Sequence, residues 1–148
     1  MSGRFAVRRP RREDLDQIME IERASFGADA WDRKLFAESF DAGGDLFLVA
    51  ERSGKIQGYL LASWRGRRAE VASVAVDPAW RGQGAASALM EGVLRRLRRR
   101  RVTRLVLMVK TTNHAARAFY EKYAFEKVRR VRRYYEDGSD GWLMARGI

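Results

Sequence analysis

Cysteine is absent from the 148 residues, and histidine occurs once. Without cysteine there can be no disulfide scaffold, thiolate zinc site or cysteine nucleophile, and a single histidine cannot make a histidine-rich metal site. We therefore expect chemistry that uses no metal. No apolar run approaches the roughly 20 residues needed to span a bilayer. Residues 1–5 also lack the apolar core of a secretory signal, so we expect a cytoplasmic protein without membrane contact.

Negative charge is also scarce. The 30 Lys+Arg outweigh 19 Asp+Glu and leave a formal net charge of +11, which favours anionic partners such as phosphates, acidic peptides or nucleic acid. Much of the excess falls in residues 95–101, at the end of a predicted helix, where cations complement the carbonyl end of the helix dipole. This run is either a solvated basic face or a contact for nucleic acid.

The remaining composition is that of one globular domain. A length of 148 residues with 46% hydrophobic content is enough for one sizeable core. Because no linker or internal repeat interrupts the chain, we expect a single domain over residues 1–148.

Hydrophobic periodicity indicates a mixed order of elements. The pattern predicts helices near residues 15–22, 31–40, 86–97 and 115–123, the second ended by Gly43 and Gly44, and strands or extended segments at 5–9, 46–50, 59–64, 71–76, 105–109, 128–135 and 142–145. Short hairpins in the first half and helical crossovers in the second imply a mixed sheet covered by helices.

A glycine-rich turn joins the strand that ends at Val76 to the long helix. Backbone N–H groups at a helix start have no internal partner and favour negative charge. Gly82 and Gly84 would let the main chain approach phosphate oxygens, and Arg81 adds a charged donor. Glycines in such a turn can also serve only close packing.

Two motifs carry a resemblance to a known family. Residues 74–90, VAVDPAWRGQGAASALM, resemble the signature of the GNAT superfamily of N-acetyltransferases, in which Arg/Gln-x-x-Gly-x-Gly/Ala binds the CoA pyrophosphate. Arg81, Gly84 and Ala86 match its three diagnostic positions, and Asn113 and Tyr120 match the second motif. The resemblance covers nearly the whole chain.

The resemblance implies an α/β fold with a mixed, mostly antiparallel seven-stranded sheet flanked by about four helices. It also implies acetyl-CoA as co-substrate, with no metal. The residues it assigns to cofactor binding are Val74, Val76, Arg81, Gly82, Gln83, Gly84, Ala85, Ala86, Asn113 and Tyr120.

Within that superfamily, residues 134–144, YYEDGSDGWLM, look like the tail of ribosomal-protein alanine N-acetyltransferases and related protein amino-terminal acetyltransferases. This likeness implies that Trp31, Tyr134 and Tyr135 contact the first residues of a protein or peptide substrate, with ribosomal proteins among the candidate acceptors. The two tyrosines can alternatively fill the sheet surface.

Direct acetyl transfer needs a neutral amine, a polarised thioester carbonyl and a proton for the leaving thiolate. By the resemblance, a backbone N–H near Val76 faces the carbonyl, and Tyr120 gives the proton to the CoA sulfur. A phenol with an ordinary pKa of about 10 is protonated at neutral pH and suits that role. The alternative for Tyr120 is simple packing beside Phe119.

The expected base is missing. The related alanine acetyltransferases carry glutamate where this chain has Met108, and a thioether cannot accept a proton. Glu70 lies six residues before Val76, so both side chains share a strand face, and we take Glu70 as the candidate base. It can equally be a rim charge beside Arg67 and Arg68.

A missing base affects the choice of acceptor. At neutral pH roughly a tenth of an α-amine with a pKa of about 7.7–8.0 is deprotonated, against about 0.1% or less of a lysine amine. The sequence therefore favours acetylation of a protein or peptide α-amine. The alternatives are a small-molecule amine acceptor or a catalytically weak acyl-CoA-binding protein.

One further departure from the family concerns the end of the last helix. Ala124 stands where the family usually has glycine, just after a helix. If its φ is positive, we expect the position to be strained.

Overall fold

The computed structural model describes residues 5–27, 30–41 and 46–148. The predicted end of the second helix at Gly43 and Gly44 lies outside these residues. The chain divides into two compact units, which are described separately: unit 1 comprises Met1–Ser63 with Ser73–Arg96, and unit 2 comprises Trp64–Ala72 with Leu97–Ile148.

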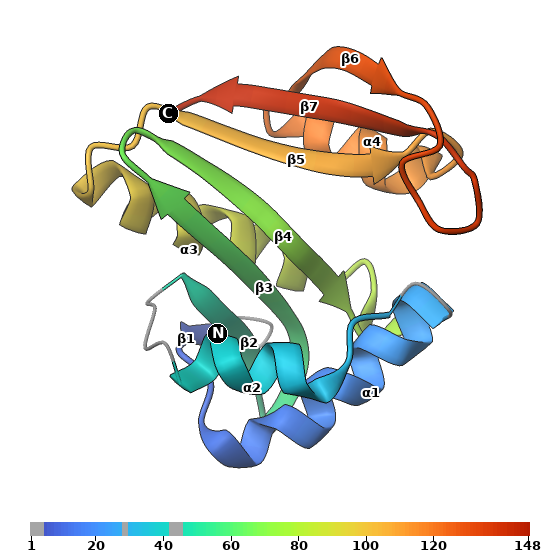
Figure 1. The fold of residues 1–148 in the computed structure, drawn as a ribbon. Coiled ribbons are helices and arrows are strands. Elements are labelled where there is room, and N and C mark those ends of the chain that lie inside the picture. Colours follow the sequence, from blue (N-terminus) through green and yellow to red (C-terminus); the bar gives the residue numbers. More distant parts are fainter. Residues whose placement is uncertain (1–4, 28–29, 42–45) are drawn as a thin grey trace. The chain divides into compact units, whose positions relative to one another are not determined.

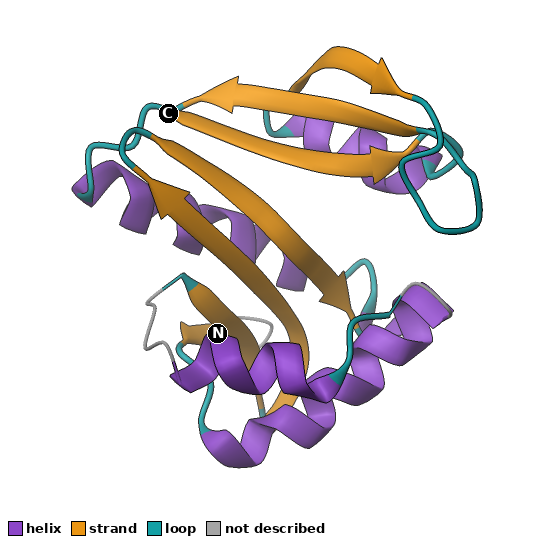
Figure 2. Cartoon of the chain, in the orientation of Figure 1, coloured by secondary structure: helices purple, strands orange, loops and turns teal. Residues whose placement is uncertain are grey.

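The described residues form seven strands in one mixed sheet, and the strand order is β1-β2-β3-β4-β5-β7-β6. The strands are β1 (Ala6–Arg8), β2 (Phe47–Arg52), β3 (Lys55–Arg65), β4 (Arg68–Val76), β5 (Arg104–Lys110), β6 (Glu126–Val131) and β7 (Gly141–Gly147). The α-helices are α1 (Leu15–Phe26), α2 (Arg33–Asp41), α3 (Ala85–Arg99) and α4 (His114–Lys122). β4 and β5 pair in parallel, and β1–β2, β2–β3, β5–β7 and β6–β7 pair antiparallel. The predicted fold class is confirmed (Figures 1 and 2).

In unit 1, helices cover both faces of the sheet (Figure 1). Phe36 of α2 packs on Phe47, with ring centroids 5.9 Å apart. On the other face a Cβ added to Gly92 of α3 would lie 3.6 Å from Leu48 Cδ1. Because neighbouring residues of a strand point to opposite faces, Phe47 and Leu48 place α2 and α3 on opposite sides of β2.

In unit 2, β5, β7 and β6 lie side by side with α4 against them (Figure 2). Asn113 caps α4, because its side-chain oxygen accepts the Ala116 N–H at 3.1 Å. Beyond the helix, Ala124 has φ 68°, so the condition for strain at this position is met.

Two predicted boundaries are wrong. The second helix was expected from Trp31, but α2 begins at Arg33 because the Asp32 carboxylate accepts the Leu35 N–H at 3.0 Å and ends the preceding segment. The extended stretch 128–135 was expected to reach Tyr135, but β6 ends at Val131. Arg133 has φ 50° and donates its N–H to Asp140 at 3.0 Å, so the chain leaves the ladder before the tyrosines.

Candidate active site

Unit 1 contains the predicted phosphate-binding turn, residues 81–84, between β4 and α3. Pro78–Trp80 forms a short 3-10 helix whose first N–H groups are capped by Asp77, which accepts from Ala79 at 2.9 Å. Arg81 then returns the chain to an extended conformation, and α3 begins at Ala85 with no acidic residue in its first turn. The first N–H groups of an α-helix lack an intrahelical acceptor and carry the positive end of the helix dipole, so this end of α3 favours negative charge.

The conformation of the turn explains its two glycines. Gly82 and Gly84 have φ of 79° and 97°, a region that costs other residues about 1–2 kcal/mol. A Cβ on either glycine would meet no described atom within 4 Å. Close packing is therefore not the reason for glycine here, and the backbone faces open space in front of the helix start.

The side chains around the turn differ in their freedom. Arg81 is exposed, and its Nε lies 3.4 Å from the Val76 carbonyl oxygen. Gln83 accepts a hydrogen bond from Arg52, whose guanidinium also lies 5.9 Å from the Trp80 ring centroid. Arg52 of β2 therefore contacts one side of the turn, while Arg81 stays exposed and can bind an anion.

The other predicted cofactor contacts of unit 1 lie on β4 just before the turn and at the start of α3 just after it. Val74 and Val76 are half-buried on β4, Ala85 is buried and Ala86 is half-buried at the start of α3. The structure thus brings together every predicted cofactor residue that belongs to unit 1.

Glu22 of α1 is the functional candidate that sequence reasoning missed. It is 1% exposed, and its Oε1 accepts hydrogen bonds from the Tyr59 hydroxyl and, at 3.1 Å, from Ser73 Oγ. Its Oε2 accepts the Trp31 N–H at 2.9 Å. Burial, followed by the nearby Glu22 charge, raises the pKa of Tyr59, so the phenol stays a donor to the carboxylate.

Glu22 lies seven residues after Leu15 and four after Ile18, a spacing that places it on the apolar stripe of its helix. That spacing was the available signal. Through Glu22, unit 1 holds the backbone of Trp31, the predicted acceptor contact, to the core strands β3 and β4.

Unit 2 contains Tyr120, the predicted proton donor, in the last turn of α4. Its ring is 8% exposed and packs between Phe119 and Phe125, with centroids 5.7 Å away in each case. Burial, and to a smaller extent Tyr135, raises the pKa of Tyr120. Its hydroxyl has no hydrogen-bond partner among the described residues of its unit, so it is a protonated donor available to a reactant.

Met108, which stands where the related enzymes have a base, lies beside Gly141, as do Tyr134 and Tyr135. A Cβ on Gly141 would lie 2.8 Å from Met108 Cε, 3.3 Å from Tyr135 Cε2 and 3.5 Å from Tyr134 Cβ. A side chain at position 141 would displace these groups, so glycine permits this packing. The position of the missing carboxylate is thus filled by a thioether against aromatic and backbone atoms.

Two acids that follow Tyr134 and Tyr135 in the same loop, Asp137 and Asp140, form ion pairs with residues of the neighbouring strands. The two rings meet edge to face at 4.9 Å, and Lys110 Nζ lies 5.1 Å from the Tyr135 centroid. Lys110 also pairs with Asp137 at 3.0 Å, and Arg130 pairs with Asp140 at 2.8 Å.

These contacts lower the pKa of both Asp137 and Asp140. Hydrogen bonds from the Ser139 side chain and backbone, with Lys110 next, lower the pKa of Asp137. The Arg133 N–H and then Arg130 lower the pKa of Asp140. With both acids ionised, the loop is ordered while Tyr134 remains 50% exposed, so this tyrosine does not fill the sheet surface.

Glu70, the candidate base, is exposed on β4. The parallel register pairs it with Val106, two residues before Met108 on β5. In-register neighbours share a face of the sheet, so Glu70 and Met108 lie on adjacent strands with side chains on one side.

Two absences apply to residues 5–27, 30–41 and 46–148. No helix there is long and apolar enough to cross a membrane. Within the same ranges, no three residues among His, Cys, Asp and Glu gather into a group that could hold a metal ion.

Comparisons with known proteins agree with this geometry. The sequence model of a family described as "Acetyltransferase (GNAT) family" matches residues 15–125. An N-alpha-acetyltransferase from Saccharolobus solfataricus is 31% identical over 97% of this chain and 93% of its own length. Among solved structures, Ard1 from Thermoplasma volcanium superposes with a TM-score of 0.92 and 27% identity, covering 97% of both chains. The ribosomal-protein-S18-alanine N-acetyltransferase from Escherichia coli gives a TM-score of 0.84 and 30% identity, covering 97% of this chain and 94% of that one.

Proposed function

Because the chain belongs to the acetyltransferase (GNAT) family, we propose that it transfers an acetyl group from acetyl-CoA directly to the α-amino group of a protein or peptide. The observation that carries the proposal is the open glycine turn before α3, which combines the start of a long helix with an exposed arginine. The family match runs through residues of both units, which supports one acetyltransferase domain over residues 1–148.

Acetyl-CoA binding is assigned to the turn and the strand before it. Arg81 would pair with the pyrophosphate, and the N–H groups of residues 82–86 would surround its oxygens. The backbone of Val74 and Val76 would align the pantetheine arm along β4, with the Val76 N–H toward the thioester oxygen. Asn113 would add a polar contact from the start of α4.

In the transfer step the neutral amine attacks the thioester carbonyl carbon and the carbon–sulfur bond breaks. The thiolate takes one proton, the new amide nitrogen releases one to water or to Glu70, and the donor regains its proton from water. Tyr120 supplies the proton for the thiolate in our proposal, since burial keeps its phenol protonated. No covalent enzyme intermediate is needed, which agrees with the absence of cysteine from the sequence.

The acceptor is assigned from the missing base. The packing of Met108 against Gly141 and Tyr135 puts no carboxylate at that position, so an acceptor that is already partly neutral reacts best. Glu70 is the one candidate replacement, on the same sheet face. Trp31, Tyr134 and Tyr135 would hold the first residues of the acceptor, and ribosomal proteins are candidate acceptors because a relative of known structure acts on one.

The test is a matched pair of peptides that differ only in which amine is free. One has a free α-amine and no lysine; the other has a blocked amino terminus and one lysine. Release of free CoA gives the rate for each. We expect kcat/KM for the first peptide to rise with pH and level near the amine pKa of about 8, and the lysine peptide to react poorly at neutral pH.

Two variants test the base. Glu70→Gln should lower kcat/KM by about 100-fold or more only if Glu70 is the base. Met108→Glu restores a carboxylate and should raise activity below about pH 7 if water reaches the site. In a site without water, burial of the carboxylate charge would cost free energy and cancel the gain. A lysine peptide that reacts faster than the α-amine peptide would overturn the assignment, and transfer to small amines alone would identify a small-molecule acetyltransferase.

A further inference from the structure

Unit 2 presents a cluster of arginines around one exposed tryptophan, at the start of β4 and β5 and next to Glu70 on β4. The cluster lies where the β3–β4 turn meets the segment after α3. Its members are Trp64, Arg67, Arg68, Arg100, Arg101 and Arg104.

Contacts within unit 2 hold these residues together. The Arg67 carbonyl accepts the N–H groups of Thr103 at 2.8 Å and of Arg104 at 3.2 Å. Arg68 pairs in register with Arg104 across β4 and β5. The surface is therefore fixed by backbone bonds, although its residues are far apart in sequence.

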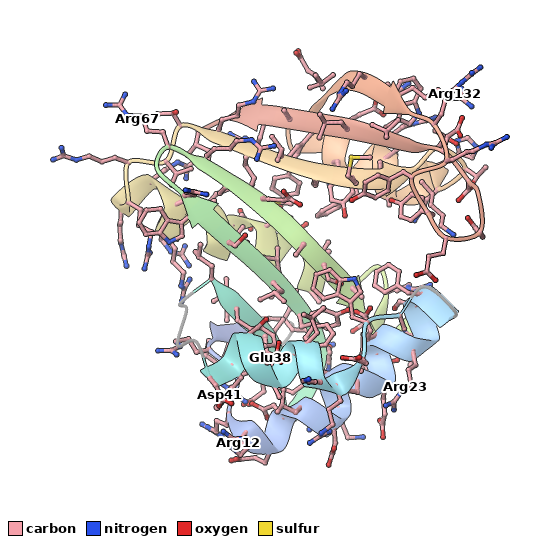
Figure 3. All side chains as sticks on the ribbon, viewed as in Figure 1. Arg12, Arg23, Glu38, Asp41, Arg67 and Arg132 are labelled. Carbon is pink, nitrogen blue, oxygen red and sulfur yellow. The ribbon has the colours of Figure 1, made fainter. Side chains whose placement is uncertain are left out.

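The cluster has excess positive charge. Arg67, Arg68, Arg101 and Arg104 are exposed, and in the described ranges none of these four forms an ion pair with an acid. The Arg67 side chain extends away from the fold (Figure 3). Several guanidinium groups without counter-charge, held within one surface, attract a partner with closely spaced negative charges.

Trp64 adds an aromatic surface to this charge. It is 47% exposed, and the Arg100 guanidinium lies 5.6 Å from its ring centroid. Exposed aromatic rings stack on bases, and guanidinium groups bind phosphate oxygens in pairs and also stack on bases. An acidic peptide would use the charge but offers no row of flat rings to Trp64.

We propose that this arginine cluster is a docking surface for single-stranded RNA, with phosphates bound by the exposed arginines and a base stacked near Trp64. None of the residues of this cluster is assigned a role in acetyl transfer, so loss of RNA binding should leave acetylation of a short peptide unchanged. A failure of the RNA-binding proposal is therefore distinguishable from a failure of the proposed function.

The experiment measures binding of a fluorescein-labelled oligouridylate RNA of about 20 nucleotides by fluorescence anisotropy at several salt concentrations. The cluster variant carries Arg67→Ala, Arg101→Ala and Arg104→Ala. The control variant carries Arg9→Ala, Arg23→Ala and Arg129→Ala, which removes the same charge from exposed positions outside the cluster. Thermal unfolding and peptide acetylation establish that both variants are folded and active.

We expect the cluster variant to lose about 10-fold or more in RNA affinity and the salt slope to fall by about 2, since each lost phosphate contact on a single strand removes about 0.7 from it. The control variant should change little. Trp64→Leu, which keeps the charge, should weaken binding about 5-fold or more through lost stacking. Equal losses in the cluster and control variants, or equal competition by a poly-glutamate peptide of the same length, would overturn the proposal.

Discussion

Tyr59 in unit 1 and Tyr120 in unit 2 are both buried tyrosines with a raised pKa, yet they differ in what their hydroxyls contact. The Tyr59 hydroxyl donates to Glu22 and lies 3.1 Å from Ser73 Oγ. Tyr120 is surrounded by aromatic rings and has no such partner within its unit. A buried polar group with partners stabilises the fold, whereas one without them is available to a ligand.

The largest expected effect separates these two tyrosines. Tyr120→Phe should lower kcat/KM by about 100-fold or more, the usual range for loss of a general acid, and should leave the free energy of unfolding nearly unchanged. Tyr59→Phe removes a donor from the buried Glu22 and should lower the free energy of unfolding by about 1–3 kcal/mol. Peptide acetylation and urea denaturation of both variants measure the difference. Full activity in Tyr120→Phe would show that this hydroxyl is not the proton donor.

The next effect concerns the open turn of unit 1. Arg81→Ala should weaken acetyl-CoA binding by about 10-fold or more, since hydrogen bonds to charged groups contribute about 1.5–3 kcal/mol. The melting temperature should stay the same because Arg81 is exposed.

Gly84→Val should weaken binding too. Because Gly84 has a φ of 97°, valine there adds about 1–2 kcal/mol of backbone strain and lowers the melting temperature. Calorimetric titration measures affinity, with Arg23→Ala as the control (Figure 3), and unchanged affinity in Arg81→Ala would contradict the assignment of the turn.

A smaller effect tests backbone strain in unit 2. Ala124 has φ 68° at the end of α4, so Ala124→Gly should relieve about 1 kcal/mol of strain, less a few tenths for the freer unfolded chain. The melting temperature should rise. Ala118→Gly, an exposed position inside the same helix, should destabilise by about 1 kcal/mol and serves as the matched control. A fall in both variants would mean that Ala124 carries no strain.

The smallest effect concerns the exposed acids of the tyrosine loop. Because the pKa values of Asp137 and Asp140 are lowered in the folded protein, their contribution to stability is present above the unfolded pKa of about 3.9 and is lost as pH falls below it. Urea denaturation between about pH 5 and about pH 3 should show this loss. The Asp137→Asn, Asp140→Asn double variant should show a weaker pH dependence over the same interval, and an identical dependence would exclude these acids as its source.

Features governed by neighbouring residues were predictable. The glycine turn after Val76 depends on local backbone sterics, whereas Ala124 was singled out by the family resemblance. Local steric constraints act within a few residues, so they can be read directly along the chain.

The glycine turn between β4 and α3 was therefore placed correctly from the sequence, but the end of β6 before Tyr134 and Tyr135 was not. Tyr134 and Tyr135 leave the strand because Asp140 takes the Arg133 N–H, seven residues away. A strand pattern in 128–135 contains no sign of that competing acceptor.

The sequence by itself determined the order of helices and strands, the glycine turn before α3 and the thioether at position 108. Only the tertiary structure decided that Glu22 is buried, since its partners Tyr59 and Ser73 lie 37 and 51 residues away. It also decided that Met108 packs over Gly141 and that arginines from separate segments share one surface. Periodicity encodes which face of an element is apolar, whereas contacts between distant segments arise only when the sheet brings them together.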